Sequence, residues 1–188
     1  LEYKSSITSC NENRNPKACF FIGHTYFNDG IHKEAETYLM KACYGSHPKG
    51  CYFLASIYRR GFGPIDKNSD LAVQYLQKAC DLGDKYSCLR AGGIFQSGEE
   101  IKQDNLLAFD YYKKACHLNV PLGCYETGRF YEKGIGREKD DNLAKSYYKK
   151  TCGFEDKKIC KFYLNKLCKL GSSLGCEALE FANKKNNK

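Results

Sequence analysis

The placement of the cysteines is the feature that most constrains what this chain can fold into. The sequence has 12 cysteines in 188 residues, an even number and far above ordinary usage. Five successive pairs are separated by eight residues and the first pair by nine. The regular spacing predicts six disulfides, four of them Cys10–Cys19, Cys43–Cys51, Cys80–Cys88 and Cys116–Cys124, while the equally spaced Cys152, Cys160, Cys168 and Cys176 leave the pairing of the last two disulfides open at this point.

The cysteine pairs also recur with a longer period. Their first members advance by 33, 37, 36 and 36 residues, and then by 16. A unit of about 36 residues therefore repeats, as in helical repeat arrays. We expect one repeat domain over residues 1–188, with approximate repeats at 1–18 (partial), 19–50, 51–87, 88–123, 124–159 and 160–188 (a truncated repeat and capping helix).

Alignment on the cysteines indicates two amphipathic helices in each unit. Four and seven residues after the second cysteine of a pair come a small residue and an aromatic residue, on one helical face. These are Gly23 and Tyr26, Ala55 and Tyr58, Gly92 and Phe95, and Gly128 and Tyr131. Eight and five residues before the first cysteine of the next pair come an alanine and a tyrosine: Ala35 and Tyr38, Ala72 and Tyr75, Ala108 and Tyr111, and Ala144 and Tyr147. A single helical hairpin of this size cannot bury its apolar face without neighbours, so the pattern predicts an all-α solenoid of hairpins.

Two units carry a family resemblance, "CYFLASIYRRGFGPIDKNSDLAVQYLQKAC" at 51–80 and "CYETGRFYEKGIGREKDDNLAKSYYKKTC" at 124–152. They resemble Sel-one-like repeats (SLR), which are relatives of the tetratricopeptide repeat (TPR). The matching positions are fullest in Gly134, Gly136, Asp140, Ala144, Tyr147 and Tyr148. With a cysteine pair in every unit, the chain is similar to the secreted Helicobacter cysteine-rich protein family. The expected fold is an all-α, right-handed α/α solenoid of SLR/TPR-like hairpins, stapled by one disulfide per repeat.

Each predicted disulfide joins the end of the second helix of one unit to the start of the first helix of the next. Closing a loop of about nine residues would remove about 2.5 kcal/mol of chain entropy from the unfolded state. If 157–168 is one helix, Cys160 and Cys168 lie about 12 Å apart, beyond disulfide reach, which favours Cys152–Cys160 and Cys168–Cys176. The alternatives are buried free thiols and a zinc site. The cysteine spacing lacks the short gap of a zinc knuckle, so we expect no metal and no cofactor.

Persistent disulfides imply an oxidising compartment: secreted, periplasmic or, less favoured, the mitochondrial intermembrane space. No apolar run reaches 18 residues, so we expect no membrane span, and we expect that a signal peptide has been removed. The net charge of +8 comes largely from lysines on the second helices and in the tail "NKKNNK". We interpret these lysines as a solvated outer face and expect no nucleic-acid partner. We also expect a monomer.

The resemblance implies that the first helix of each unit lines a concave groove. Residues one, five and eight positions after the first-helix cysteine then face the groove: Phe20, His24 and Phe27; Tyr52, Ser56 and Arg59; Leu89, Gly93 and Gln96; Tyr125, Arg129 and Glu132. Rings beside arginines suit an extended peptide, because arginine binds a carboxylate bidentately. The alternative for the rings is half-buried packing between neighbouring helices. The predicted function is a secreted or periplasmic repeat protein that binds a peptide or protein partner, with a host protein as one candidate.

The rival hypothesis is enzymatic. The cysteine-rich family carries a penicillin-binding and β-lactamase attribution, which the resemblance extends here to a β-lactam or cell-wall-derived ligand, β-lactam hydrolysis and antibiotic resistance. Serine β-lactamases use a serine followed by a lysine three residues later. Two weak matches occur, "SYYK" from Ser146 to Lys149 and "SHPK" from Ser46 to Lys49, and neither has a second base nearby in sequence. We therefore assign no catalytic residue and favour the binding scaffold.

Overall fold

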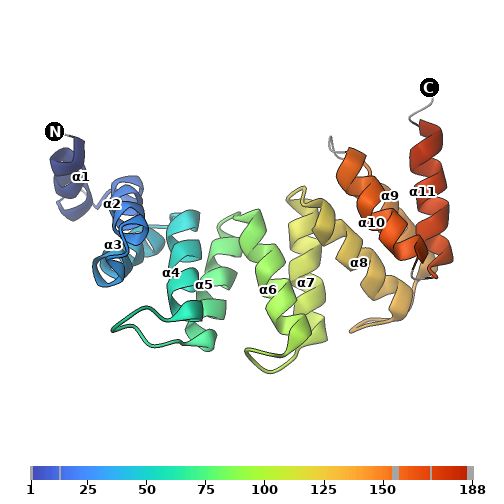
Figure 1. Ribbon diagram of the computed structural model, residues 1–188, viewed down its shortest axis with the longest axis horizontal. Coiled ribbons are helices and arrows are strands. Elements are labelled where there is room, and N and C mark those ends of the chain that lie inside the picture. The colour runs from blue at the N-terminus through green and yellow to red at the C-terminus, as the bar shows by residue number, and fades with distance from the viewer. Residues whose placement is uncertain (1, 13, 154–156, 170, 186–188) are drawn as a thin grey trace. The chain divides into compact units, whose positions relative to one another are not determined.

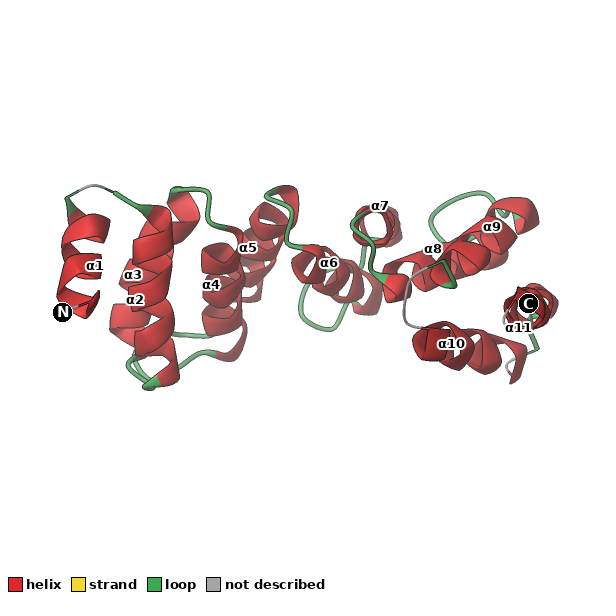
Figure 2. Cartoon of the chain, turned by 90° about the horizontal axis from the view of Figure 1, so that it is seen from above, coloured by secondary structure: helices red, strands yellow, loops and turns green. Residues whose placement is uncertain are grey.

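A computed structural model describes residues 2–12, 14–153, 157–169 and 171–185, and Figures 1 and 2 show this part of the chain as helices joined by short loops. Its helices are α1 (Glu2–Asn11), α2 (Pro16–Asn28), α3 (His32–Tyr44), α4 (Pro48–Arg60), α5 (Ser69–Asp81), α6 (Lys85–Ser97), α7 (Asn105–His117), α8 (Pro121–Lys133), α9 (Asp141–Thr151), α10 (Lys157–Lys169) and α11 (Ser173–Lys185). The described residues contain no strand, only an isolated bridge between Phe62 and Ile65. The all-helical hairpin fold predicted from the cysteine period is confirmed.

Local sequence signals set the helix ends. Proline occupies the first turn of α2, α4 and α8, where its missing N–H costs nothing. The second helices α5, α7 and α9 begin after a polar cap whose side-chain oxygen accepts a backbone N–H three residues on, at 2.8–3.0 Å. These caps are Asn68, Asp104 and Asp140. The second helix of the first repeat, α3, differs, because it begins after Ile31, which makes no side-chain cap.

Aromatic stacking joins the two helices of a hairpin. The aromatic residue seven after the first-helix cysteine stacks on the tyrosine five before the next cysteine, with ring centroids 5.6–5.8 Å apart. The four pairs are Tyr26–Tyr38, Tyr58–Tyr75, Phe95–Tyr111 and Tyr131–Tyr147. The two aromatic positions that recur in the aligned sequence thus contact each other in every one of these hairpins, in the offset geometry that aromatic rings favour.

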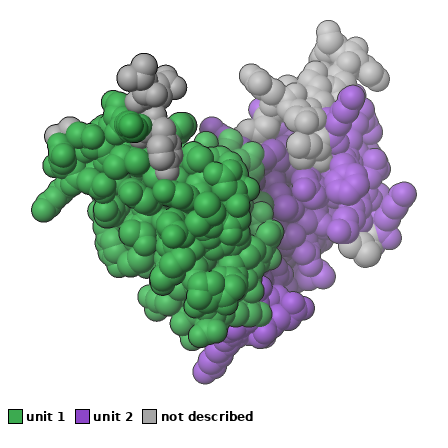
Figure 3. Space-filling view, turned by 60° about the vertical axis from the view of Figure 1, so that its left-hand side comes forward, with its two compact units in different colours: residues 1–91 green, residues 92–188 purple. Residues whose placement is uncertain are grey.

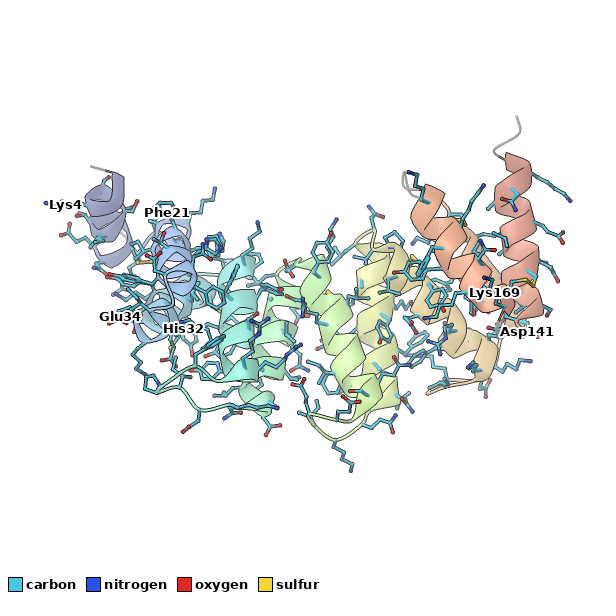
Figure 4. All side chains as sticks on the ribbon, viewed as in Figure 1. Lys4, Phe21, His32, Glu34, Asp141 and Lys169 are labelled. Atoms are coloured by element: carbon cyan, nitrogen blue, oxygen red, sulfur yellow. A yellow bond between two sulfur atoms is a disulfide. The ribbon has the colours of Figure 1, made fainter. Side chains whose placement is uncertain are left out.

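Six disulfides join consecutive helices, in the pairs that the spacing and the helix geometry predicted. Their Cα–Cα distances are 4.5–4.8 Å, within the normal range, and no cysteine among the described residues is free. Side-chain sticks in Figure 4 include these bonds. Six disulfides indicate an oxidising compartment.

The contacts of the chain divide it into two compact units, residues 1–91 and residues 92–188 (Figure 3). In residues 1–91 the core is built around Leu39, Leu54 and Ile57. In residues 92–188 one core cluster includes Tyr125, Tyr148 and Leu164. The repeat boundaries and the single domain expected from the sequence remain predictions. Among the described residues, no helix combines the length and apolar character needed to cross a membrane.

Candidate functional site

A ring-lined cavity of about 600 Å³ lies on the first helices of the repeats within residues 1–91. Helices α2, α4 and α6 each contribute side chains to it, and Asp84 adds a carboxylate from the turn before α6. Its lining residues are Phe20, His24, Lys49, Tyr52, Phe53, Asp84, Tyr86, Leu89 and Arg90. The volume is in the range of small-ligand and side-chain pockets, so the cavity can accept a large apolar side chain.

Ring–ring contacts hold the cavity wall in place. The Phe20 ring stacks on His47 with centroids 4.4 Å apart. The Phe53 ring meets His24 edge-on at 4.7 Å and Phe27 edge-on at 5.0 Å. These five rings are half-buried, so they stabilise α2 against α4 and still present part of their surface. Three of these rings, Phe20, His24 and Phe53, line the cavity and also pack between the helices.

His47 connects this wall to the start of α4. Its Nδ1 accepts the backbone N–H of Gly50 at 3.3 Å and so caps the helix. Burial lowers the pKa of the His47 imidazole below its usual value, and the positive charges of Lys49 and Lys17 lower it further. The ring is therefore neutral at neutral pH, as a cap that accepts a hydrogen bond requires.

A second, smaller cavity of about 50 Å³ adjoins the first, and Tyr52 and Arg90 line both. The Arg90 guanidinium lies over the Tyr52 ring, 5.5 Å from its centroid. The lining residues of the smaller cavity are Tyr52, Ala55, Ser56, Arg59, Arg60, Leu76 and Arg90. Three arginines from α4 and α6 thus line the cavity that adjoins the aromatic wall.

Most groove residues predicted in the first three repeats lie at these two cavities. Phe20, His24, Tyr52 and Leu89 line the larger cavity, and Ser56 and Arg59 line the smaller one. Phe27 does not line either cavity but supports Phe53 from the side. The assignment of these residues to ligand binding is still a prediction.

Tyr125 requires a correction. It stands at the same repeat position as Tyr52, but only 3% of it is exposed. Helix α10 packs against α8 and places the Tyr163 ring 4.8 Å from the Tyr125 ring, while Tyr148 lies on its other side. Tyr125 is therefore a core residue and not a ligand-facing one, contrary to the expectation.

The other groove residues predicted in residues 92–188 are engaged within the protein. The Tyr112 hydroxyl donates to the Gln96 side chain at 2.7 Å, and the Tyr148 hydroxyl donates to Glu132 at 2.6 Å. The Arg129 guanidinium donates to Glu126 at 2.7 Å. Because these groups are held by partners within the chain, we do not place a ligand there. Gly93 is half-buried, and as a glycine it has no side chain that could contact a ligand.

Five residues that line the larger cavity were missed by sequence reasoning: Lys49, Phe53, Asp84, Tyr86 and Arg90. A signal existed for two of them. Lys49 and Tyr86 each stand two residues before the first-helix cysteine. They are therefore three residues before the first predicted groove positions, Tyr52 and Leu89. Positions three apart share a helical face, so the groove register extends one turn toward the start of each first helix.

Among the described residues, no hydrogen bond joins the serine to the lysine in either serine–lysine match. Ser146 is exposed on α9, and the Lys149 ammonium lies over the Phe181 ring, 4.9 Å from its centroid. Ser46 is also exposed and sits in a turn with φ of 65°. Lys49 lines the larger cavity, but Ser46 is not among the lining residues.

Comparison with known proteins agrees with this architecture of disulfide-stapled helical hairpins. The family model described as the Sel1 repeat matches residues 48–84, 85–120 and 121–152, more than half of the chain. The chain belongs to the Sel1 repeat family. In its fold it is similar to the crystal structure of a Sel1 repeat protein from Oxalobacter formigenes, with a TM-score of 0.71 and 24% identity over 87% of this chain and 72% of that one.

Three further relatives are a cysteine-rich bacterial protein and two assembly factors. Cysteine-rich protein B of Helicobacter pylori is 32% identical over 69% of this chain and 92% of that chain, with a TM-score of 0.51. Cytochrome c oxidase assembly factor 7 of Xenopus tropicalis is 26% identical over 111 residues, 55% of this chain and 48% of that protein. Assembly factor 7A of Xenopus laevis is 28% identical over an alignment of 111 residues with the same coverage. The chain spans about half the length of the curated relatives it matches.

Proposed function

We propose that this Sel1 repeat protein is exported to the periplasm or secreted, and there binds an extended peptide segment of a protein partner. The binding site is the aromatic groove over α2, α4 and α6. The observation that carries this proposal is the cavity of about 600 Å³ that rings from successive first helices surround. Clusters of aromatic and arginine side chains are the composition typical of binding hot spots.

The rigidity of the groove supports the same function. Disulfide Cys43–Cys51 joins α4 to α3, and Cys80–Cys88 joins α6 to α5, so two of the helices that carry the cavity are cross-linked to their neighbours. Cross-linked helices lose little conformational entropy when a ligand binds, so a modest contact area can give useful affinity. The six disulfides support export, because disulfides persist in oxidising compartments. The same binding mode would serve an assembly factor, which is how the Xenopus relatives are named.

Selection from a displayed peptide library on the oxidised protein tests the proposal. The variant Tyr86→Ala is the sharpest probe, because 57% of Tyr86 is exposed and its loss should not disturb the fold. We expect this variant to bind a selected peptide with about tenfold lower affinity, as measured by fluorescence anisotropy. Phe162→Ala removes a ring that is 65% exposed on α10 and serves as the matched control. Unchanged affinity in both Tyr86→Ala and Tyr52→Ala would overturn the groove assignment.

A further inference from the structure

The smaller cavity differs from the larger one in its charge. It is lined by Arg59, Arg60 and Arg90, and no acidic residue is among its lining residues. The larger cavity is lined by an acidic residue, Asp84, as well as by Lys49, and the Asp84 carboxylate accepts the backbone N–H of Ser87 at 2.7 Å. The smaller cavity is therefore the part of the groove with an excess of positive charge, which favours an anionic ligand group.

The arginines are held in position by their helices. Arg59 and Arg60 lie in the last turn of α4, where the helix dipole favours positive charge. Arg90 comes from α6 and is held over the Tyr52 ring, an arrangement in which cation and ring attract each other. Arg60 and Arg90 are exposed, and Arg59 is half-buried and interacts within the protein. An arginine guanidinium presents paired N–H donors that match the two oxygens of a carboxylate.

The adjacency of the two cavities determines how far apart the two bound side chains of the ligand lie. Because Tyr52 and Arg90 line both, a ligand side chain in one cavity is next to a side chain in the other. In an extended peptide, residues i and i+2 point to the same side and lie about 7 Å apart. One ligand residue can then fill the ring-lined cavity while the residue two positions away reaches the arginines.

We propose that Arg60 and Arg90, with the Tyr52 ring against which Arg90 lies, form a subsite for an aspartate or glutamate side chain of the bound peptide. The recognised segment carries a large apolar residue at one position and the acidic residue two positions away. This proposal rests on the proposed groove function and specifies its ligand. The apolar residue supplies most of the affinity, and the carboxylate fixes the register and raises the rate of association.

The experiment uses an array of seven-residue peptides that are acetylated at the N-terminus and amidated at the C-terminus. One position is fixed as phenylalanine, and the position two residues away is varied over all amino acids, glutamine and phosphoserine included. Blocked ends ensure that the only carboxylates are those of side chains. On the oxidised full chain we expect aspartate and glutamate to bind about tenfold better than glutamine.

Variants assign the preference to the subsite. Arg60→Gln with Arg90→Gln should abolish the acidic preference while the dependence on phenylalanine remains. Arg60→Lys with Arg90→Lys should restore it only in part, because lysine keeps the charge but not the paired donors. Arg137→Gln is the control: it removes an exposed arginine from residues 92–188, together with its ion pair to Asp110, and should leave the peptide preference unchanged. Unchanged thermal unfolding shows that the variants keep their fold.

Each contrary outcome has a distinct meaning. Binding that needs the phenylalanine but shows no acidic preference overturns the subsite and leaves the groove standing. An acidic preference that survives in the glutamine variant also overturns the subsite. A stronger response to phosphoserine than to aspartate or glutamate overturns the assignment to a carboxylate side chain. Absence of any phenylalanine-dependent binding overturns both the subsite and the proposed groove.

Discussion

The ring of Tyr112 on α7 lies directly against the backbone of Gly92 on α6. A Cβ atom added to Gly92 would come within 2.8 Å of the ring. One turn further along α6, Gln96 accepts the hydrogen bond of the same tyrosine hydroxyl at 2.7 Å. The next repeat has the same contact, because Tyr148 lies against Gly128 in the same way. The small residue of each of these first helices is therefore the position at which the two helices of a hairpin approach closely.

Gly92→Ala should lower the free energy of unfolding by about 1–3 kcal/mol, because the new methyl group overpacks the contact with Tyr112. Its neighbour provides a matched control. A Cβ at Gly93 would meet only the Tyr112 hydroxyl, at an ordinary 3.7 Å. Gly93→Ala should be neutral or stabilise by up to about 1 kcal/mol through helix propensity. Urea unfolding followed by circular dichroism measures both, and equal effects would contradict the close-approach explanation.

Tyr125→Ala and Tyr52→Ala should separate folding from binding, although the two tyrosines share a repeat position. Tyr125 is buried against Tyr163 and Tyr148, so its truncation should cost about 3–5 kcal/mol of stability. Tyr52 is half-buried at the cavity wall, so its truncation should mainly weaken peptide binding. Thermal unfolding and anisotropy report the two effects. A larger loss of stability in Tyr52→Ala would show that the burial difference does not control the outcome.

The His47 cap should make stability depend on pH. The pKa of the imidazole is lowered in the folded protein, so the unfolded chain binds the proton more readily. The stabilising contribution of the neutral ring is therefore complete above the unfolded pKa, about 6.5, and is lost as the pH falls through the lower folded pKa. His47→Asn keeps a capping side chain that does not titrate. We expect a flatter profile of stability between about pH 7 and 5 in this variant, and an unchanged slope would refute the His47 contribution.

Mass measurement after alkylation tests the redox state. The denatured but unreduced protein should take up no label, because all 12 cysteines are paired in the structure. Full reduction before alkylation should give 12 labels and provides the control. More than two labels on the unreduced protein would mean that more than one bridge is missing, and would reject the disulfide framework.

A chromogenic cephalosporin tests the enzymatic alternative. We expect no turnover above the buffer background, because Ser146 is exposed and the Lys149 ammonium lies over a phenylalanine ring. Ser146→Ala and Ser46→Ala should match the parent protein in both hydrolysis and stability. Hydrolysis by the parent that Ser146→Ala removes, with the fold intact, would favour the β-lactamase attribution over the binding function.

The features that recur in every repeat could be predicted because they depend on contacts between residues close in the chain. Each disulfide closes a turn of eight or nine residues, and each stacked pair such as Tyr58–Tyr75 lies within one hairpin. Contacts this short in sequence leave a periodic signal that alignment on the cysteines brings out. The caps Asn68, Asp104 and Asp140 are equally local. The hairpin fold, the cysteine pairs and the face of each first helix are therefore predictable from the amino-acid sequence alone.

The sequence by itself thus determined the helical hairpins, their cysteine links and the residues that share a helical face. Only the tertiary structure decided which of these faces is open. Tyr52 and Tyr125 stand at one repeat position, yet Tyr52 lines a cavity and Tyr125 is covered by Tyr163 of α10. The meeting of Arg60 and Arg90 likewise depends on how α4 and α6 lie together, across 30 residues of chain. Exposure depends on what neighbouring helices place over a residue, and that information is not carried by its own repeat.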